Sequence, residues 1–149
     1  MKSLSVQQQY LTTQVGTADR LQLVVMLYEG AISFLNQAKE KMAGQDSVGK
    51  GHYLGKALDI IAELNASLNF QEGGGVAANL FHLYNFMTMH LTKANINWDA
   101  GAVDEVVALL SKLKEAWEEV CHKARTGVME EAAAGETRTP RQHMGSLVV

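Results

Sequence analysis

The stretch VDEVVALLSKLKEAWEEVC, residues 103–121, decides how this sequence folds. Its apolar residues recur at intervals of three and four, through Val103, Leu110, Trp117 and Cys121, and its charged residues fall on the opposite side of a helical projection. Such intervals place side chains on one face of an α-helix, whereas a half-buried strand alternates at every second residue. The stretch therefore predicts a long amphipathic helix.

Two segments near the start of the chain show the same periodicity. The first begins at Thr17, whose hydroxyl is suited to cap a free backbone amide, and we expect it to run to about residue 43. The second covers residues 53–70 and follows a glycine-rich connection, although Asp46 offers an alternative, earlier cap for it. No proline interrupts either segment, because the single proline of the chain is Pro140.

A third periodic segment follows the glycine run Gly73–Gly75 and ends near residues 95–97, and Asp99 is placed to cap the fourth helix. Four helices joined by short connections predict an all-α, antiparallel four-helix bundle. After residue 125 the periodicity is lost. We divide the chain into a flexible N-terminal arm, a bundle and a mostly disordered C-terminal tail: residues 1–16, 17–125 and 126–149.

Composition narrows the class of protein further. The chain has 149 residues, 47% of them hydrophobic and 19% charged, with a net charge of −3, which is typical of one globular domain. An acidic chain with no basic block is a poor partner for nucleic acid, and no apolar run approaches the length of a membrane span. With a single cysteine, Cys121, and a polar start, we expect a cytoplasmic protein that does not insert into membranes.

The sequence gives little support for catalysis. None of the five histidines forms an i, i+4 pair with another, so we expect no metal, no cofactor and no catalytic residues. One alternative remains open, because His52, Leu54, Gly55 and Lys56 loosely resemble the histidine phosphotransfer bundles, in which a helix-borne histidine relays phosphate. In those domains lysine precedes glycine, whereas here the order is reversed.

More apolar side chains are present than the seam of one bundle can bury. The third helix carries Phe81, Phe86 and Met89 outside its main apolar stripe. These residues either form an exposed surface for apolar partners or are the scattered exposed hydrophobic residues of an ordinary bundle, and the sequence alone does not distinguish the two. Asn65 lies within the apolar stripe of the second helix, where it either bonds another side chain or meets the backbone of a bound peptide. Four residues are predicted to be core: Leu21, Val24, Tyr28 and Trp117.

Several stretches together resemble one family. They are Tyr10, MLYEGAI at 26–32, KALDIIAELNASLNF at 56–70, ANLFHLYNFMTMHLTKAN at 78–95 and EVVALLSKLKEAW at 105–117. In this order they resemble the FliS family of flagellar secretion chaperones.

The resemblance implies a non-enzymatic cytosolic chaperone. It would bind the disordered C-terminal segment of flagellin in apolar grooves, prevent premature polymerisation and deliver the subunit to a component of the export gate. A generic helical adaptor is a further alternative to this function. The residues that the resemblance assigns to the partner are Tyr10, Leu58, Ile61, Asn65, Leu68, Leu83, Phe86, Met87 and His90.

Overall fold

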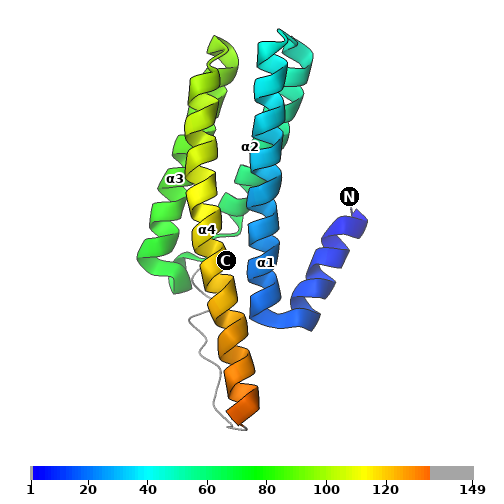
Figure 1. Ribbon diagram of the computed structural model, residues 1–149, viewed down its shortest axis with the longest axis vertical. Helices are drawn as coiled ribbons and strands as arrows, with labels where there is room; N and C mark the ends of the chain where they lie inside the picture. The colour runs from blue at the N-terminus through cyan, green and yellow to red at the C-terminus, as the bar shows by residue number, and fades with distance from the viewer. Residues whose placement is uncertain (1, 135–149) are drawn as a thin grey trace.

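A computed structural model describes residues 2–134 of the chain and the side chains of residues 19–127. Its elements are α1 (Lys2–Ala43), α2 (Ser47–Ala66), α3 (Phe70–Asn97) and α4 (Ala100–Ala134). Successive helices run in opposite directions, with α1 packed between α2 and α4, and α3 completing the bundle (Figure 1). The predicted all-α, antiparallel four-helix bundle is confirmed.

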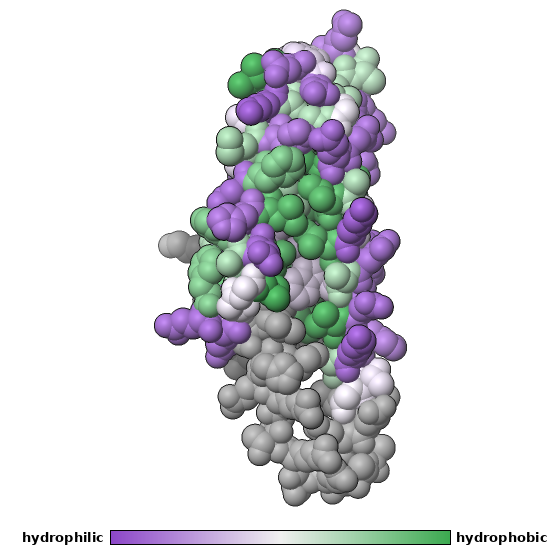
Figure 2. Space-filling model, turned by 90° about the vertical axis from the view of Figure 1, so that its left-hand side faces the viewer, coloured by the Kyte–Doolittle hydropathy of each residue, from purple (hydrophilic) through white to green (hydrophobic). Residues whose placement is uncertain are grey.

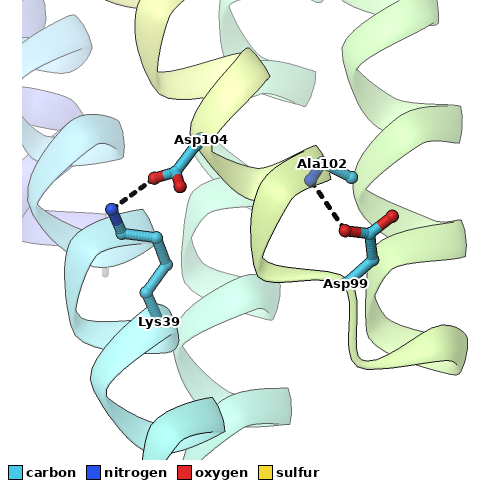
Figure 3. A network of polar contacts seen from close by, with 4 residues as sticks. All are labelled: Lys39, Asp99, Ala102 and Asp104. Carbon is cyan, nitrogen blue, oxygen red and sulfur yellow. Dashed lines mark hydrogen bonds and ion pairs between the residues drawn. The ribbon is translucent and has the colours of Figure 1, made fainter.

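Side-chain caps set where two of the helices begin. Asp46 precedes α2, and its carboxylate accepts a hydrogen bond of 2.9 Å from the backbone amide of Gly49. The earlier of the two predicted starts for this helix is therefore confirmed. Asp99 caps α4 in the same way and accepts a 3.1 Å bond from the amide of Ala102, as Figure 3 shows.

The start of α3 has two parts. Asn69 caps its first turn, since the Asn69 side-chain oxygen accepts a 3.1 Å bond from the amide of Glu72. Gly74 then interrupts the helix with φ of 51° and ψ of −125°, a conformation that residues with a Cβ rarely adopt. The predicted break at the glycines is present, but the helix begins one turn before it, at Phe70.

Two predicted boundaries differ from the structure. The start at Thr17 is wrong, because α1 begins at Lys2 and includes most of the predicted arm. The first part of α1, dark blue in Figure 1, bends away from the rest of the helix and lies beside the bundle. At the other end, α4 continues as a helix to Ala134, beyond the predicted end of the bundle. The remainder of the predicted tail, residues 135–149, lies outside the described residues.

The core contains a pair of buried tyrosines. Leu21, Val24, Tyr28 and Trp117 are all buried, as predicted. The hydroxyl of Tyr28, on α1, shares a hydrogen bond with the hydroxyl of Tyr84, on α3. Burial raises the pKa of both phenols above the usual value, because a phenolate is poorly solvated inside the bundle. Both tyrosines therefore stay protonated, and their hydrogen bond satisfies two polar groups in an otherwise apolar core.

Ion pairs line the seam between the first and last helices. They are Asp19–Arg125 at 3.2 Å, Glu29–Lys114 at 3.9 Å, and Lys39–Asp104, the last drawn in Figure 3. Each pair is partly exposed to solvent, so each adds little to stability. Together they leave the outer side of α1 and α4 strongly polar.

Candidate functional site: an apolar strip along α3

Large apolar side chains gather on the surface along α3. Figure 2 shows this side of the molecule, with apolar residues collected along its middle and hydrophilic residues on both sides. Phe86 and Met89 are 46% and 62% exposed, and Phe81 is exposed as well. Exposed apolar surface with polar margins is typical of a site for a protein partner. All three residues that lie outside the main apolar stripe of this helix are therefore exposed.

One cross-helix contact shows which residues of α3 and α4 lie at the same level. The His90 imidazole, on α3, is 2.6 Å from the carboxylate of Glu105, on α4. One turn back along α3 lies Phe86, and one turn forward along α4 lies Leu109. Because the helices are antiparallel, these two residues lie at the same level of the bundle, and Leu83 and Leu113 follow at the next.

We call this set the α3–α4 strip. Its members are Leu83, Phe86 and His90 on α3 and Leu109 and Leu113 on α4. The three leucines are partly buried against the core, while Phe86 is exposed and stacks on the His90 ring with the ring centroids 4.9 Å apart. The strip therefore combines three leucines that are anchored in the core with an exposed aromatic ring beside them. This combination is suited to the apolar face of a bound helix or extended peptide.

A second surface lies where α2 meets α3. The Asn65 side-chain amide donates a 3.1 Å hydrogen bond to the side-chain oxygen of Asn85, so of the two roles left open for Asn65 the structure shows the bond to another side chain. The Asn65 side-chain oxygen is itself buried and accepts no hydrogen bond. Leu58 and Leu68, close to Asn65 in the sequence, pack against the core. Both are only partly buried, so each retains some exposed surface.

Two residues assigned to the partner belong to the core instead. Ile61 and Met87 are both 0% exposed and lie among the bundle's buried residues, so they have no surface to present to another chain. Helical periodicity places them on the inward side of their helices, and only their neighbours one position away reach the surface. Tyr10 lies within α1, but its side chain is outside those described.

A hollow elsewhere on the molecule has a different character. It has a volume of about 410 Å³ and lies between α1 and Lys114 of α4. Six of its seven lining residues carry polar or charged side chains: Glu29, Ser33, Asn36, Gln37, Glu40 and Lys114, with Ile32 as the seventh. The large aromatic side chains Phe81 and Phe86 therefore lie on the open surface of α3 and not in this hollow.

The described side chains show no constellation for metal chemistry. No three His, Cys, Asp or Glu residues among them come together as a metal ion requires. His52, the residue of the phosphotransfer alternative, lies exposed on α2 with its ring edge against Tyr53. None of the described helices is long and apolar enough to cross a membrane.

Sequence reasoning missed the partners of the assigned residues. Leu109 was absent from the predicted set, yet its place one turn after Glu105 puts it opposite Phe86. Asn85 was likewise unassigned. A partly buried amide such as that of Asn65 needs a hydrogen-bond partner, and an asparagine on the neighbouring helix is able to supply one. The burial of Lys50 was not predicted, because lysine is normally exposed. In the structure Lys50 is buried and its ammonium lies over the Trp98 ring.

Comparison with known proteins decides the family. The profile of the flagellar protein FliS family matches residues 2–124, which include every residue of the α3–α4 strip. The chain belongs to this family. The resemblance found in the sequence is therefore confirmed over nearly the whole bundle.

Individual FliS relatives agree with the profile. The chain is 42% identical to the flagellar secretion chaperone FliS of Salmonella typhimurium over 111 residues, which cover 74% of this chain and 82% of that protein. It is 39% identical to the FliS of Vibrio cholerae, over 72% of this chain and 79% of that protein. It is 36% identical to the flagellar secretion chaperone FliSB of Pseudomonas aeruginosa, over 82% of this chain and 98% of that protein.

Proposed function

We propose that this protein is a cytoplasmic flagellar secretion chaperone that binds the C-terminal segment of flagellin without catalysing a reaction. It holds that segment on the α3–α4 strip, prevents premature polymerisation and delivers the subunit to a component of the export gate. The observation that carries the proposal is the exposed Phe86, beside three half-buried leucines, in a chain of the FliS family.

The surface chemistry suits such a client. A segment that is disordered alone and apolar on one side gains its binding energy by burying that side, and it loses part of that energy to ordering. Burial of about 1,000–3,000 Å² is typical of such coupled folding and is compatible with dissociation constants from micromolar to nanomolar. A strip open along one side of the bundle lets a peptide enter from the side, so no large rearrangement of the bundle is required.

Calorimetry with a synthetic flagellin C-terminal peptide tests the proposal directly. The wild-type chain is expected to bind the peptide, and Phe86→Asp is expected to weaken binding by at least about tenfold, because it places a charge in the apolar contact. Ile96→Asp is the matched control, since Ile96 is 73% exposed and lies at the end of α3 away from Phe86. Circular dichroism of both variants should match the wild type.

Two results would contradict the proposal. One is a wild-type chain that gives neither heat nor a shift in elution with the peptide. The other is equal weakening by Phe86→Asp and Ile96→Asp, which would mean that the strip is not the contact surface. A turbidity assay provides a second readout: an equimolar amount of the chain should suppress the assembly of purified flagellin into filaments, and Phe86→Asp should suppress it less.

A further inference from the structure

The glycine run at the start of α3 is longer than the local backbone requires. Gly74 needs its glycine, because its φ of 51° is strained for any other residue. Gly75 has no such need, since its φ is not positive and a Cβ added there would meet no atom within 4 Å. Glycine inside a helix destabilises it relative to alanine. The second glycine thus lowers helix stability beside the kink, where it leaves the backbone freer to move.

An aromatic contact spans this break in the helix. Phe70, before the kink, sets its ring edge-to-face against Phe81, after the kink, with the ring centroids 5.7 Å apart and the planes at 76°. Both rings remain partly exposed, at 51% and 37%. The first turn of α3 is held by its hydrogen bonds to Asn69, by the burial of Gly73 and by this surface contact, and another apolar side chain is able to replace the last of these.

A buried hydrogen-bond acceptor without a donor lies between α2 and α3, near this contact. Asn85 lies one turn after Phe81, and its partner Asn65 has a buried side-chain oxygen that accepts no hydrogen bond. A buried acceptor without a donor is unfavourable in the free chain. A peptide that reached this corner between α2 and α3 would bring backbone amides, which are donors of the kind this oxygen lacks.

We propose that residues 70–73 form a flap, hinged at Gly74 and Gly75, which competes with the client for contact with the Phe81 ring. In the free chain the Phe70 ring makes that contact. In the complex an apolar side chain of the flagellin segment takes the place of Phe70, and the flap swings away. This inference rests on the proposed function, and it adds a step that controls when the corner between α2 and α3 is accessible.

The direction in which Phe70→Ala changes the affinity for the peptide tests the competition between Phe70 and the client. If the flap covers Phe81 for most of the time, the apparent dissociation constant is the intrinsic one divided by the open fraction. Phe70→Ala removes the competitor, so peptide binding should tighten by about threefold to tenfold, as expected for an open fraction of about 10–30%. Phe81→Ala removes the shared contact and should weaken binding, whereas Ile96→Ala, at the other end of α3, should leave it unchanged.

A second variant tests the hinge. Gly75→Ala fits the space available and should stiffen the backbone, so the association rate constant measured by stopped-flow fluorescence should fall about threefold. Circular dichroism checks that all variants are folded. Weaker or unchanged binding by Phe70→Ala, with the wild type binding normally, would overturn the flap and leave the proposed function standing.

Hydrogen exchange of the free, full-length chain tests the flap without any client. Amides of residues 70–76 should exchange at least about tenfold faster than those of residues 80–91, and Gly75→Ala should slow the first group only. Equal exchange in the two segments would overturn the flap even if the peptide binds. Absence of peptide binding to the wild type, with fast exchange in residues 70–76, would instead contradict the proposed function and the competition with a client.

Discussion

The two helices α1 and α3 differ in the polarity of the side chains that face solvent. Beyond its buried stripe, α1 presents mainly polar residues such as Glu29 and Ser33 to solvent, with Met26 as an exposed hydrophobic residue among them. Ion pairs such as Glu29–Lys114 join α1 to α4 along the seam. Beyond an equally buried stripe, α3 presents Phe86 and Met89. The fold uses the inner sides of both helices, so the outer apolar residues of α3 are available for another role.

The largest effect is expected from the core that the two helices share. Tyr28→Ala removes a fully buried ring and leaves the Tyr84 hydroxyl without its partner. Truncation of a large buried aromatic side chain costs about 3–5 kcal/mol, to which the unpaired hydroxyl adds. Urea unfolding followed by circular dichroism measures the loss. A loss below about 1 kcal/mol would show that the inner sides of α1 and α3 are not the common core.

The same tyrosines predict a dependence of stability on alkaline pH. The folded state keeps both phenolic protons, because burial raises both pKa values, while the unfolded state releases them near pH 10. The unfolding free energy should therefore be insensitive to these groups below about pH 9 and fall above pH 10, by at most about 1.4 kcal/mol per pH unit for each tyrosine.

The control for this effect is the double variant Tyr28→Phe and Tyr84→Phe, which keeps the rings and removes the titrating groups. Urea titrations of both proteins between pH 8 and 11 measure the difference. If the wild type and the double variant lose stability in parallel above pH 10, the two hydroxyls are not the cause.

A smaller effect is expected at the end of the bundle, where α2 meets the last turn of α3. The Lys50 ammonium donates a 2.7 Å bond to the backbone oxygen of Asn95 and lies 3.7 Å from the centre of the Trp98 ring. Lys50→Met keeps the aliphatic chain and loses both interactions, so it should cost about 2 kcal/mol. Lys56→Met, at an exposed position of the same helix, should change the unfolding free energy by less than about 0.5 kcal/mol.

The smallest effect should be found on the outer side of α3. Phe86→Ala and Met89→Ala are expected to change the unfolding free energy by at most about 0.5 kcal/mol, because neither side chain fills the core. Leu35→Ala, at a fully buried position of α1, should cost about 2–5 kcal/mol in the same assay. A large loss from Phe86→Ala would mean that the α3–α4 strip stabilises the fold, and the contrast between the two helices would fail.

Periodicity predicted the helices but not where each of them begins and ends. The apolar intervals depend on local geometry, so they located the inward sides, including Tyr28 and Trp117. The start of α1 at Lys2 was missed, because residues 2–16 have few apolar residues in register and no cap marks the true start. The kink at Gly74 was expected from three glycines, whereas the helical turn before it depends on the cap that Asn69 supplies.

The candidate site was predictable only in part, since a surface depends on how two helices face each other. The excess of apolar residues on α3 was visible in the sequence, and Phe86 followed from it. Ile61 and Met87 were assigned wrongly because family motifs combine core residues with contact residues. The roles of Leu109 and Asn85 became visible only from the contacts His90–Glu105 and Asn65–Asn85, because these contacts join different helices and leave no local pattern in the sequence.

The seam between α1 and α4 also bears on the order of folding. Turns at residues 44–46, 67–69 and 98–99 join helices that are neighbours along the chain, and contacts between such neighbours form quickly. The seam instead joins the two ends of the bundle, through pairs such as Asp19–Arg125, and closing so long a loop costs more entropy. During synthesis on the ribosome, the bundle therefore closes only after α4 has emerged, when most of the chain has already been translated.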